Sequence, residues 1–196
     1  IEYAVLEETH DDGTTQRYII AQSRVAAYEK ELAGATQIGS LSGAELVGRR
    51  YTPLFPFFAD TPNAFHVLAA DFVSTEDGTG VVHLAPGFGE EDQNVCNAVG
   101  IPTICPMDEH GRYTSEVSTW AGVHVFDANP LIVKELKARG VVVRHDSYNH
   151  SYPHCWRCAE PLVYRAISSW FVQVTAFRDR MVELNQQIRW VPEHIK

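Results

Sequence analysis

Apolar and polar positions alternate at the start of the chain. Residues 1–8 predict a strand, residues 10–13 supply turn chemistry, and residues 17–21 predict the returning strand. Two prolines among aromatic side chains predict an irregular loop over 51–58. Further strands are predicted over 65–74, 81–84, 101–107, 141–144 and 162–174.

Helical patterns separate these strands. Ser23 is the expected N-cap of a helix that stops near Gly34. Asp127 is the expected N-cap of a second helix, which runs through residue 137. The acidic run from Glu90 begins another helix, and apolar residues at helical spacing over 177–188 predict a last one. Short strands interrupted irregularly by helices do not match a regular βαβ array. The expected fold class is a compact β-barrel core decorated with α-helices, a mixed α and β protein.

Composition is that of an ordinary globular protein. The 196 residues are 45% apolar and 21% charged, which suits one domain or one domain with a small appendage. No apolar run approaches the ~18 residues of a membrane span, and no leader opens the chain, so we expect a soluble protein of the cytoplasm. The net charge of −9 argues against a broad basic face for nucleic acid but leaves room for local contact with one strand end.

The stretch Gly78–Asp92 (GTGVVHLAPGFGEED) has the richest chemistry. A buried strand would deliver His83 to its end, a glycine corner would let backbone approach a ligand, and a helix N-terminus would present Asp92. A carboxylate there can hold an ammonium group, and backbone N–H groups can hold an oxyanion. From the residues alone, the plainer alternatives weigh more: Asp92 complementing the helix dipole and His83 as a core histidine.

Four cysteines are present, and without secretory signals we expect free thiols. Cys96 and Cys105 lie in apolar surroundings and are expected to be buried. Cys155 and Cys158 form a C-x-x-C, half of a tetrahedral zinc site. His150 and His154 lie near enough to be considered as further ligands, though His154 directly precedes Cys155 and would be strained. A metal-free knuckle, with its other ligands outside this chain, is the favoured alternative.

Two other enzyme classes fit poorly. A zinc nucleobase deaminase needs H-x-E and P-C-x-x-C, but Leu84 and Ala85 follow His83, and His154 separates Pro153 from Cys155. No G-x-S-x-G nucleophile elbow is present for a serine hydrolase. Cys96 and Cys105 have no evident activating base.

Several long motifs resemble one family. Gly78–Asp92 resembles the signature of the editing insertion (connective peptide 1) of class I synthetases for isoleucine, valine and leucine. The isoleucyl version is matched best, through the segments DEHGRYT (108–114), WAGVHVFDAN (120–129), HSYPHCWRC (150–158) and YRAISSWF (164–171). The resemblance implies a β-barrel surrounded by helices, which hydrolyses valine wrongly attached to isoleucine tRNA. Valyl-adenylate is a second candidate substrate.

The resemblance also assigns roles. Asp92 would hold the substrate's α-amino group, and His83 would line the side-chain pocket and help to exclude isoleucine. Substrate-binding backbone is expected from Gly87, Phe88, Gly89 and Glu90. No cofactor is expected in the editing site, and zinc is expected only in the full-length enzyme, where partner cysteines would join Cys155 and Cys158.

One departure concerns the family's threonine-rich T-T-P-W-T peptide, a wall of the site, which is not found here. The synthetase's nucleotide-binding motifs are also not found, so we expect a fragment cut inside the insertion, of doubtful activity alone. Its expected parts are an editing domain (1–146), a cysteine knuckle loop (147–160), and a strand and helix leading toward the synthetase core (161–196). Expected partners are the valine-bearing tRNA 3′ end and the rest of the synthetase, with no membrane and a monomeric state. The alternative is a non-catalytic module that binds the tRNA 3′ end or a metal.

Overall fold

The computed structural model describes residues 1–147 and 149–195. Its contacts divide the chain into two units, Ile1–Ala166 and Ile167–Lys196. The expected boundaries at 146 and 160 stay a prediction. None of the described helices is long and apolar enough to cross a membrane.

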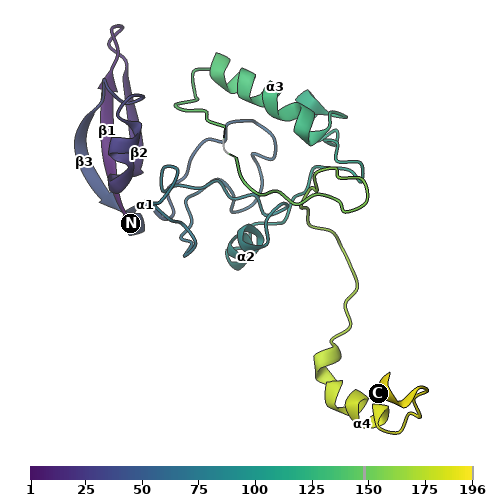
Figure 1. Ribbon diagram of the computed structural model, residues 1–196. Coiled ribbons are helices and arrows are strands. Elements are labelled where there is room, and N and C mark those ends of the chain that lie inside the picture. Colours follow the sequence, from purple (N-terminus) through teal and green to yellow (C-terminus); the bar gives the residue numbers. More distant parts are fainter. Residues whose placement is uncertain (148, 196) are drawn as a thin grey trace. The chain divides into compact units, whose positions relative to one another are not determined.

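The first unit begins with a β-hairpin (Figure 1). β1 (Glu2–Thr9) pairs antiparallel with β2 (Thr15–Ala21), so both predicted strands are confirmed. The turn between them is fixed by Asp12, whose Oδ1 accepts a hydrogen bond from the Thr14 N–H at 2.9 Å. Gly13 has a φ of 81°, a left-handed conformation that glycine adopts without strain.

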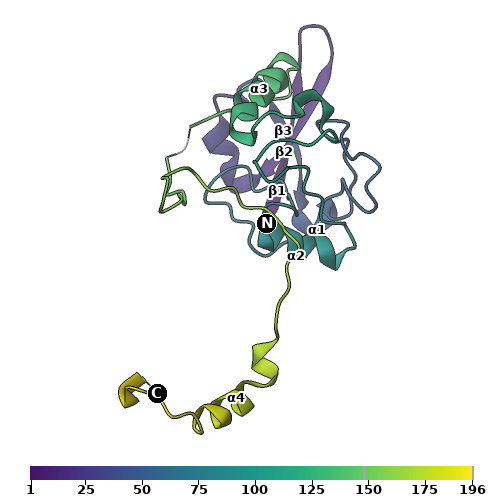
Figure 2. The same ribbon diagram turned by 90° about the vertical axis from the view of Figure 1, so that its right-hand side faces the viewer.

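A third strand, β3 (Thr36–Ser42), was not predicted. It pairs antiparallel with the other edge of β1, so the sheet order is β2-β1-β3, with β1 in the middle (Figure 1). Figure 2 shows the same sheet turned by 90°. Most of its side chains are exposed, so no apolar alternation marks it in the sequence. Backbone hydrogen bonds to β1, rather than side-chain burial, hold β3 in place.

The sheet packs its apolar side chains into two small clusters. One comprises Ala4, Leu6, Ile20 and Leu32, and the other comprises Tyr3, Ala21 and Leu46. The helix expected from Ser23 is instead the 3-10 helix η1 (Gln22–Tyr28), which has no side-chain cap at its start. The short helix α1 (Gly43–Leu46) was not predicted, although Ser42 and Glu45 form a capping box there.

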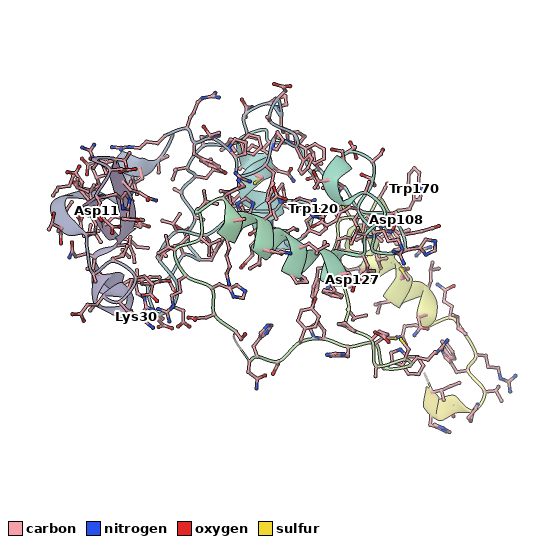
Figure 3. The ribbon with its side chains drawn as sticks, turned by 90° about the horizontal axis from the view of Figure 1, so that it is seen from above. Asp11, Lys30, Asp108, Trp120, Asp127 and Trp170 are labelled. Atoms are coloured by element: carbon pink, nitrogen blue, oxygen red, sulfur yellow. The ribbon has the colours of Figure 1, made fainter. Side chains whose placement is uncertain are left out.

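Two longer helices confirm the prediction. α2 (Glu90–Ala98) follows the glycine corner. α3 (Val125–Ala138) contributes Ala128 to a buried cluster with Val117 and Trp120, and Trp120 is labelled in Figure 3. The predicted cap of α3 is wrong, because its N-cap is His124, whose Nδ1 accepts the Phe126 N–H at 3.4 Å. Asp127 lies in the first turn of the helix instead.

The remaining elements are short. In the first unit η2 spans Ser118–Trp120. The second unit contains η3 (Val174–Ala176), α4 (Arg178–Asn185) and η4 (Glu193–Ile195). α4 confirms the last predicted helix, but it buries none of its own residues.

The other predicted strands are wrong. Residues 65–74, 81–84, 101–107, 141–144 and 162–174 contain no strand, only isolated bridges such as Arg50 to His66 and Met107 to Tyr113. The expected barrel is therefore not seen among the described residues, whose strands form one open sheet. An apolar run favours burial, but a strand also needs a partner backbone, and Val81 and Val82 instead remain half exposed, at 52% and 54%.

Candidate functional site

The backbone corner at Pro86–Gly89 is built by close packing. A turn brings the Phe88 N–H to the Ala85 carbonyl oxygen at 2.9 Å. Gly87 is buried, and a Cβ placed on it would lie 2.2 Å from the Ile104 carbonyl oxygen. Its own carbonyl oxygen accepts the Ala166 N–H at 2.7 Å. Only glycine fits this position, because backbone approaches it from the 104–105 segment.

Asp92 closes the corner from the first turn of α2. Its Oδ2 accepts the Ala85 N–H at 2.9 Å, so the carboxylate turns back toward the loop that precedes the helix. The N-cap residue Gly89 offers no side-chain cap, and a Cβ there would lie 3.1 Å from the same Oδ2. The side chain is half-buried, and its Oδ1 accepts no hydrogen bond from the described residues. One carboxylate oxygen is thus structural and the other is available.

The remaining predicted site residues surround this corner unevenly. Phe88 and Gly89 are half-buried, whereas Glu90 is exposed at the start of α2. His83 is also exposed, which excludes the alternative of a core histidine. The sequence did not indicate that Asp92 bonds to Ala85, nor that the 104–105 segment forms the opposite wall. The only available signal was the pair of glycines, Gly87 and Gly89, on either side of Phe88.

Two open hollows lie elsewhere on the described surface. One, of about 480 Å³, is lined by Asn129, Pro130, Val133, Lys134, Lys137 and His145. The other, of about 420 Å³, is lined by Ile1, Glu2, Gln22, Ser23 and Thr75. Neither is lined by His83 or Asp92, so neither hollow is the expected valine pocket.

Cys96 lies one turn along α2 from Asp92 and is buried, as expected. Burial, and then the negative charge of Asp92, raise the pKa of its thiol. A raised pKa keeps the sulfur protonated and weakly nucleophilic at neutral pH. Cys96 is therefore a packing residue of this helix rather than a nucleophile. Cys105, on the opposite wall, is half-buried, and all four cysteines are free thiols.

Cys155 and Cys158 share a tight knuckle. The Cys155 N–H donates to the Glu160 carbonyl oxygen, and the Ala159 N–H donates to the Cys155 carbonyl oxygen, both at 2.8 Å. The Cys158 N–H, followed by the Arg157 N–H and the Cys158 thiol, lowers the pKa of Cys155 by hydrogen bonding. Such N–H donors favour a thiolate, the form that binds a metal.

The knuckle offers two ligands and no more among the described residues. His154 directs Nδ1 to the Ala159 carbonyl oxygen at 2.7 Å, and His150 directs Nδ1 to the Ser151 carbonyl oxygen at 2.9 Å. No group of three or more His, Cys, Asp or Glu side chains in residues 1–147 and 149–195 is placed to hold a metal. The donor set fits half of a tetrahedral zinc site.

Comparison with known proteins identifies relatives. No family model matches the chain. It is 54% identical to an isoleucine–tRNA ligase of Mycobacterium tuberculosis over 190 residues, which cover 92% of the chain. The ligases of Nocardia farcinica and Corynebacterium efficiens are 56% and 52% identical over 94% and 100% of the chain. The chain spans only 18–19% of the length of these curated relatives. These relatives confirm the resemblance of the chain to isoleucyl-tRNA synthetases.

Proposed function

We propose that this chain, a homologue of one segment of isoleucine–tRNA ligases, edits tRNA by hydrolysing valine wrongly attached to isoleucine tRNA. It would act in the cytoplasm as part of a larger ligase, with valyl-adenylate as a second candidate substrate. The observation that carries the proposal is the corner at Gly87–Asp92, where Asp92 Oδ2 accepts a hydrogen bond from Ala85 and Oδ1 is left available. The 54% sequence identity to an isoleucine–tRNA ligase supports the proposal that the chain acts within such a ligase.

The need for a second site follows from energetics. A pocket built for isoleucine rejects valine by only about 1–3 kcal/mol, because one methylene is missing, and isoleucyl enzymes are themselves the standard illustration of this limit. A second pocket that excludes the larger side chain reverses the selection. His83 is exposed, so its side chain is free to meet the substrate's side chain in such a pocket.

Asp92 would act by position. An ammonium group held at Oδ1 fixes the scissile carbonyl relative to the corner, and such positioning can remove several kcal/mol from a barrier. A water oxygen attacks the carbonyl carbon, the bond to the ribose oxygen breaks, and that oxygen takes a proton, which leaves valine and free tRNA. The developing oxyanion needs donors. The Phe88 N–H is already bonded to Ala85, so the donors left in the corner are those of Gly87, Gly89 and Glu90, or a ribose hydroxyl.

Cys155 and Cys158 have a separate role in this proposal. They would hold zinc together with two thiolates from elsewhere in the ligase, because the knuckle itself supplies only two ligands. Zinc would supply a structural crosslink there, with no part in ester hydrolysis.

A second candidate function is a passive module that binds the tRNA 3′ end without turnover. The observation in its favour is that neither open hollow is lined by Asp92. Incubation of the chain with valyl-tRNA, with ester loss followed against buffer, separates a hydrolase from a binder. A ligase containing the segment is the positive control.

The decisive test compares Asp92→Asn with Asp92→Ala in a ligase that contains this segment. Asparagine keeps an oxygen to accept the Ala85 N–H but loses the charge that holds an ammonium group, whereas alanine loses both. We expect both variants to lose valyl-tRNA deacylation while isoleucine activation survives. Alanine should also cost about 1.5–3 kcal/mol of folding stability, the usual contribution of a hydrogen bond to a charged group, and asparagine less. Full deacylation by Asp92→Asn would refute the assignment.

A further inference from the structure

The hollow beside α3 has a lining unlike the rest of this acidic chain. Five of its residues come from α3, namely Asn129, Pro130, Val133, Lys134 and Lys137, and His145 closes it from the segment that follows. Its volume is about 480 Å³, within the range of small-ligand sites of roughly 300–1,000 Å³. Figure 3 shows α3, with Asp127 labelled in its first turn.

The lining residues include both cationic and apolar side chains. Four of the lining residues carry polar groups, namely Asn129, Lys134, Lys137 and His145, and none of the lining residues carries a carboxylate. Pro130 and Val133 are the apolar residues of the lining. A lining with both cationic and apolar side chains suits a ligand that carries an anionic group on a flat or sugar-like body.

Three acidic side chains of α3 and the neighbouring segments pair with arginines, whereas Asp127, in the first turn of α3, forms no ion pair among the described residues. Glu135 meets Arg139 at 3.9 Å on α3. Arg144, next to His145 in the chain, meets Asp146 at 2.5 Å and Glu31 at 3.8 Å. The lysines, by contrast, form no ion pair with any residue in 1–147 or 149–195. Their charge is left to an external anion.

The segment that carries His145 is anchored by its neighbour Arg144. The Arg144 Nη1 donates to the Ala27 carbonyl oxygen at 3.0 Å, and its guanidinium lies 5.0 Å from the centre of the Tyr28 ring. These contacts fix the segment next to His145 against η1. The hollow is therefore bounded by a helix on one side and a tethered segment on the other.

We propose that this hollow binds one nucleotide of the single-stranded 3′ end of the tRNA. Lys134 and Lys137, three residues apart on one helical face, would contact the two phosphates that flank the nucleotide. Pro130 and Val133 would contact its sugar and base. The assignment rests on the proposed function, in that it takes tRNA as the ligand. It explains how a chain of net charge −9 can still guide a strand end.

Salt dependence tests the contact directly. The probe is a fluorescein-labelled RNA hairpin with a single-stranded 3′ tail, and binding to the 196-residue chain is followed by fluorescence anisotropy. Each phosphate contact on a single strand adds about 0.7 to the slope of log affinity against log salt. The double variant Lys134→Gln/Lys137→Gln loses two such contacts, so its slope should be lower by about 1.4. When salt is raised from 50 to 200 mM, the affinity of the unsubstituted chain should therefore fall about sevenfold more than that of the double variant.

Lys30→Gln is the matched control, because Lys30 is exposed and does not line the hollow. We expect it to keep the slope of the unsubstituted chain. An unchanged slope in the double variant would overturn the site. So would an absence of RNA binding by the unsubstituted chain, or displacement of the RNA by polyglutamate as readily as by unlabelled RNA.

Deacylation kinetics separate this inference from the proposed function. In a ligase that contains the segment, the lysine substitutions should raise KM for valyl-tRNA and leave kcat unchanged. If the lysine variants keep a normal KM for valyl-tRNA and an unchanged salt slope, the nucleotide site in the hollow is rejected and the editing function is not. Failure of the unsubstituted ligase to hydrolyse valyl-tRNA would reject the editing function, whereas the salt slope would still report on the hollow.

Discussion

Replacement of Gly87 by alanine is the most direct test of the corner. The added Cβ would lie 2.2 Å from the Ile104 carbonyl oxygen, 3.1 Å from the carbonyl carbon and 3.2 Å from the Cys105 Cα. All three are backbone atoms, so no side chain can rotate away. Ordinary contact begins at 3.4 Å, which leaves a deficit of 3.4 − 2.2 = 1.2 Å that the two backbone segments must make up by moving apart.

The expected cost has two parts. Overpacking of a well-packed site costs about 1–3 kcal/mol. Separation of the segments also strains the hydrogen bond from the Ala166 N–H to the Gly87 carbonyl oxygen, worth about 1 kcal/mol. Together these predict a loss of about 2–4 kcal/mol, a large part of the 5–15 kcal/mol that stabilises a typical domain.

Urea unfolding followed by circular dichroism measures the global effect, and hydrogen exchange at the Ala166 amide reports on the corner itself. Gly39→Ala is the matched control, because Gly39 lies in β3 with nothing within 4 Å of a new Cβ. It should change stability by no more than about 0.5 kcal/mol. If Gly87→Ala unfolds at the same urea concentration as the unsubstituted chain and Ala166 keeps its protection, the close approach is not real.

Two further substitutions test hydrolytic selectivity and the pH dependence of stability. His83→Ala, in a ligase that contains the segment, should allow hydrolysis of correct isoleucyl-tRNA, and full protection of that ester would show that His83 does not exclude isoleucine. The second substitution concerns Asp108, whose Oδ1 accepts hydrogen bonds from the Arg112 and His110 N–H groups, each at 2.9 Å. These bonds, that of Arg112 first, lower the pKa of the Asp108 carboxyl in the folded chain. The carboxylate therefore stabilises the fold above its unfolded-state pKa of about 3.9, and this contribution is lost as pH falls through the lower folded-state pKa. Unfolding midpoints measured between about pH 5 and 2 should therefore fall less steeply for Asp108→Asn, and parallel curves would contradict this assignment.

The sequence alone predicted the elements whose signals are local. The first hairpin follows from alternation and a turn-forming run, and α2 follows from its acidic first turn. α3 was predicted from Asp127 as a capping residue, although the actual N-cap is His124. The family resemblance, confirmed by the ligase relatives, rested on long motifs in order.

Tertiary structure decided what depends on partners. β3 exists because β1 offers it a free edge, whereas 81–84 and 101–107 have strand-like sequences but no ladder, so strand propensity alone did not determine pairing. Gly87 could be read as a flexible corner, but only the packed chain shows that the 104–105 backbone occupies the place of its Cβ. Asp92 could be read as an acid at a helix start, yet the fold commits one of its oxygens to Ala85 and leaves the other available. A sequence specifies which groups a residue carries; which of them remain unpaired depends on the segments that fold against it.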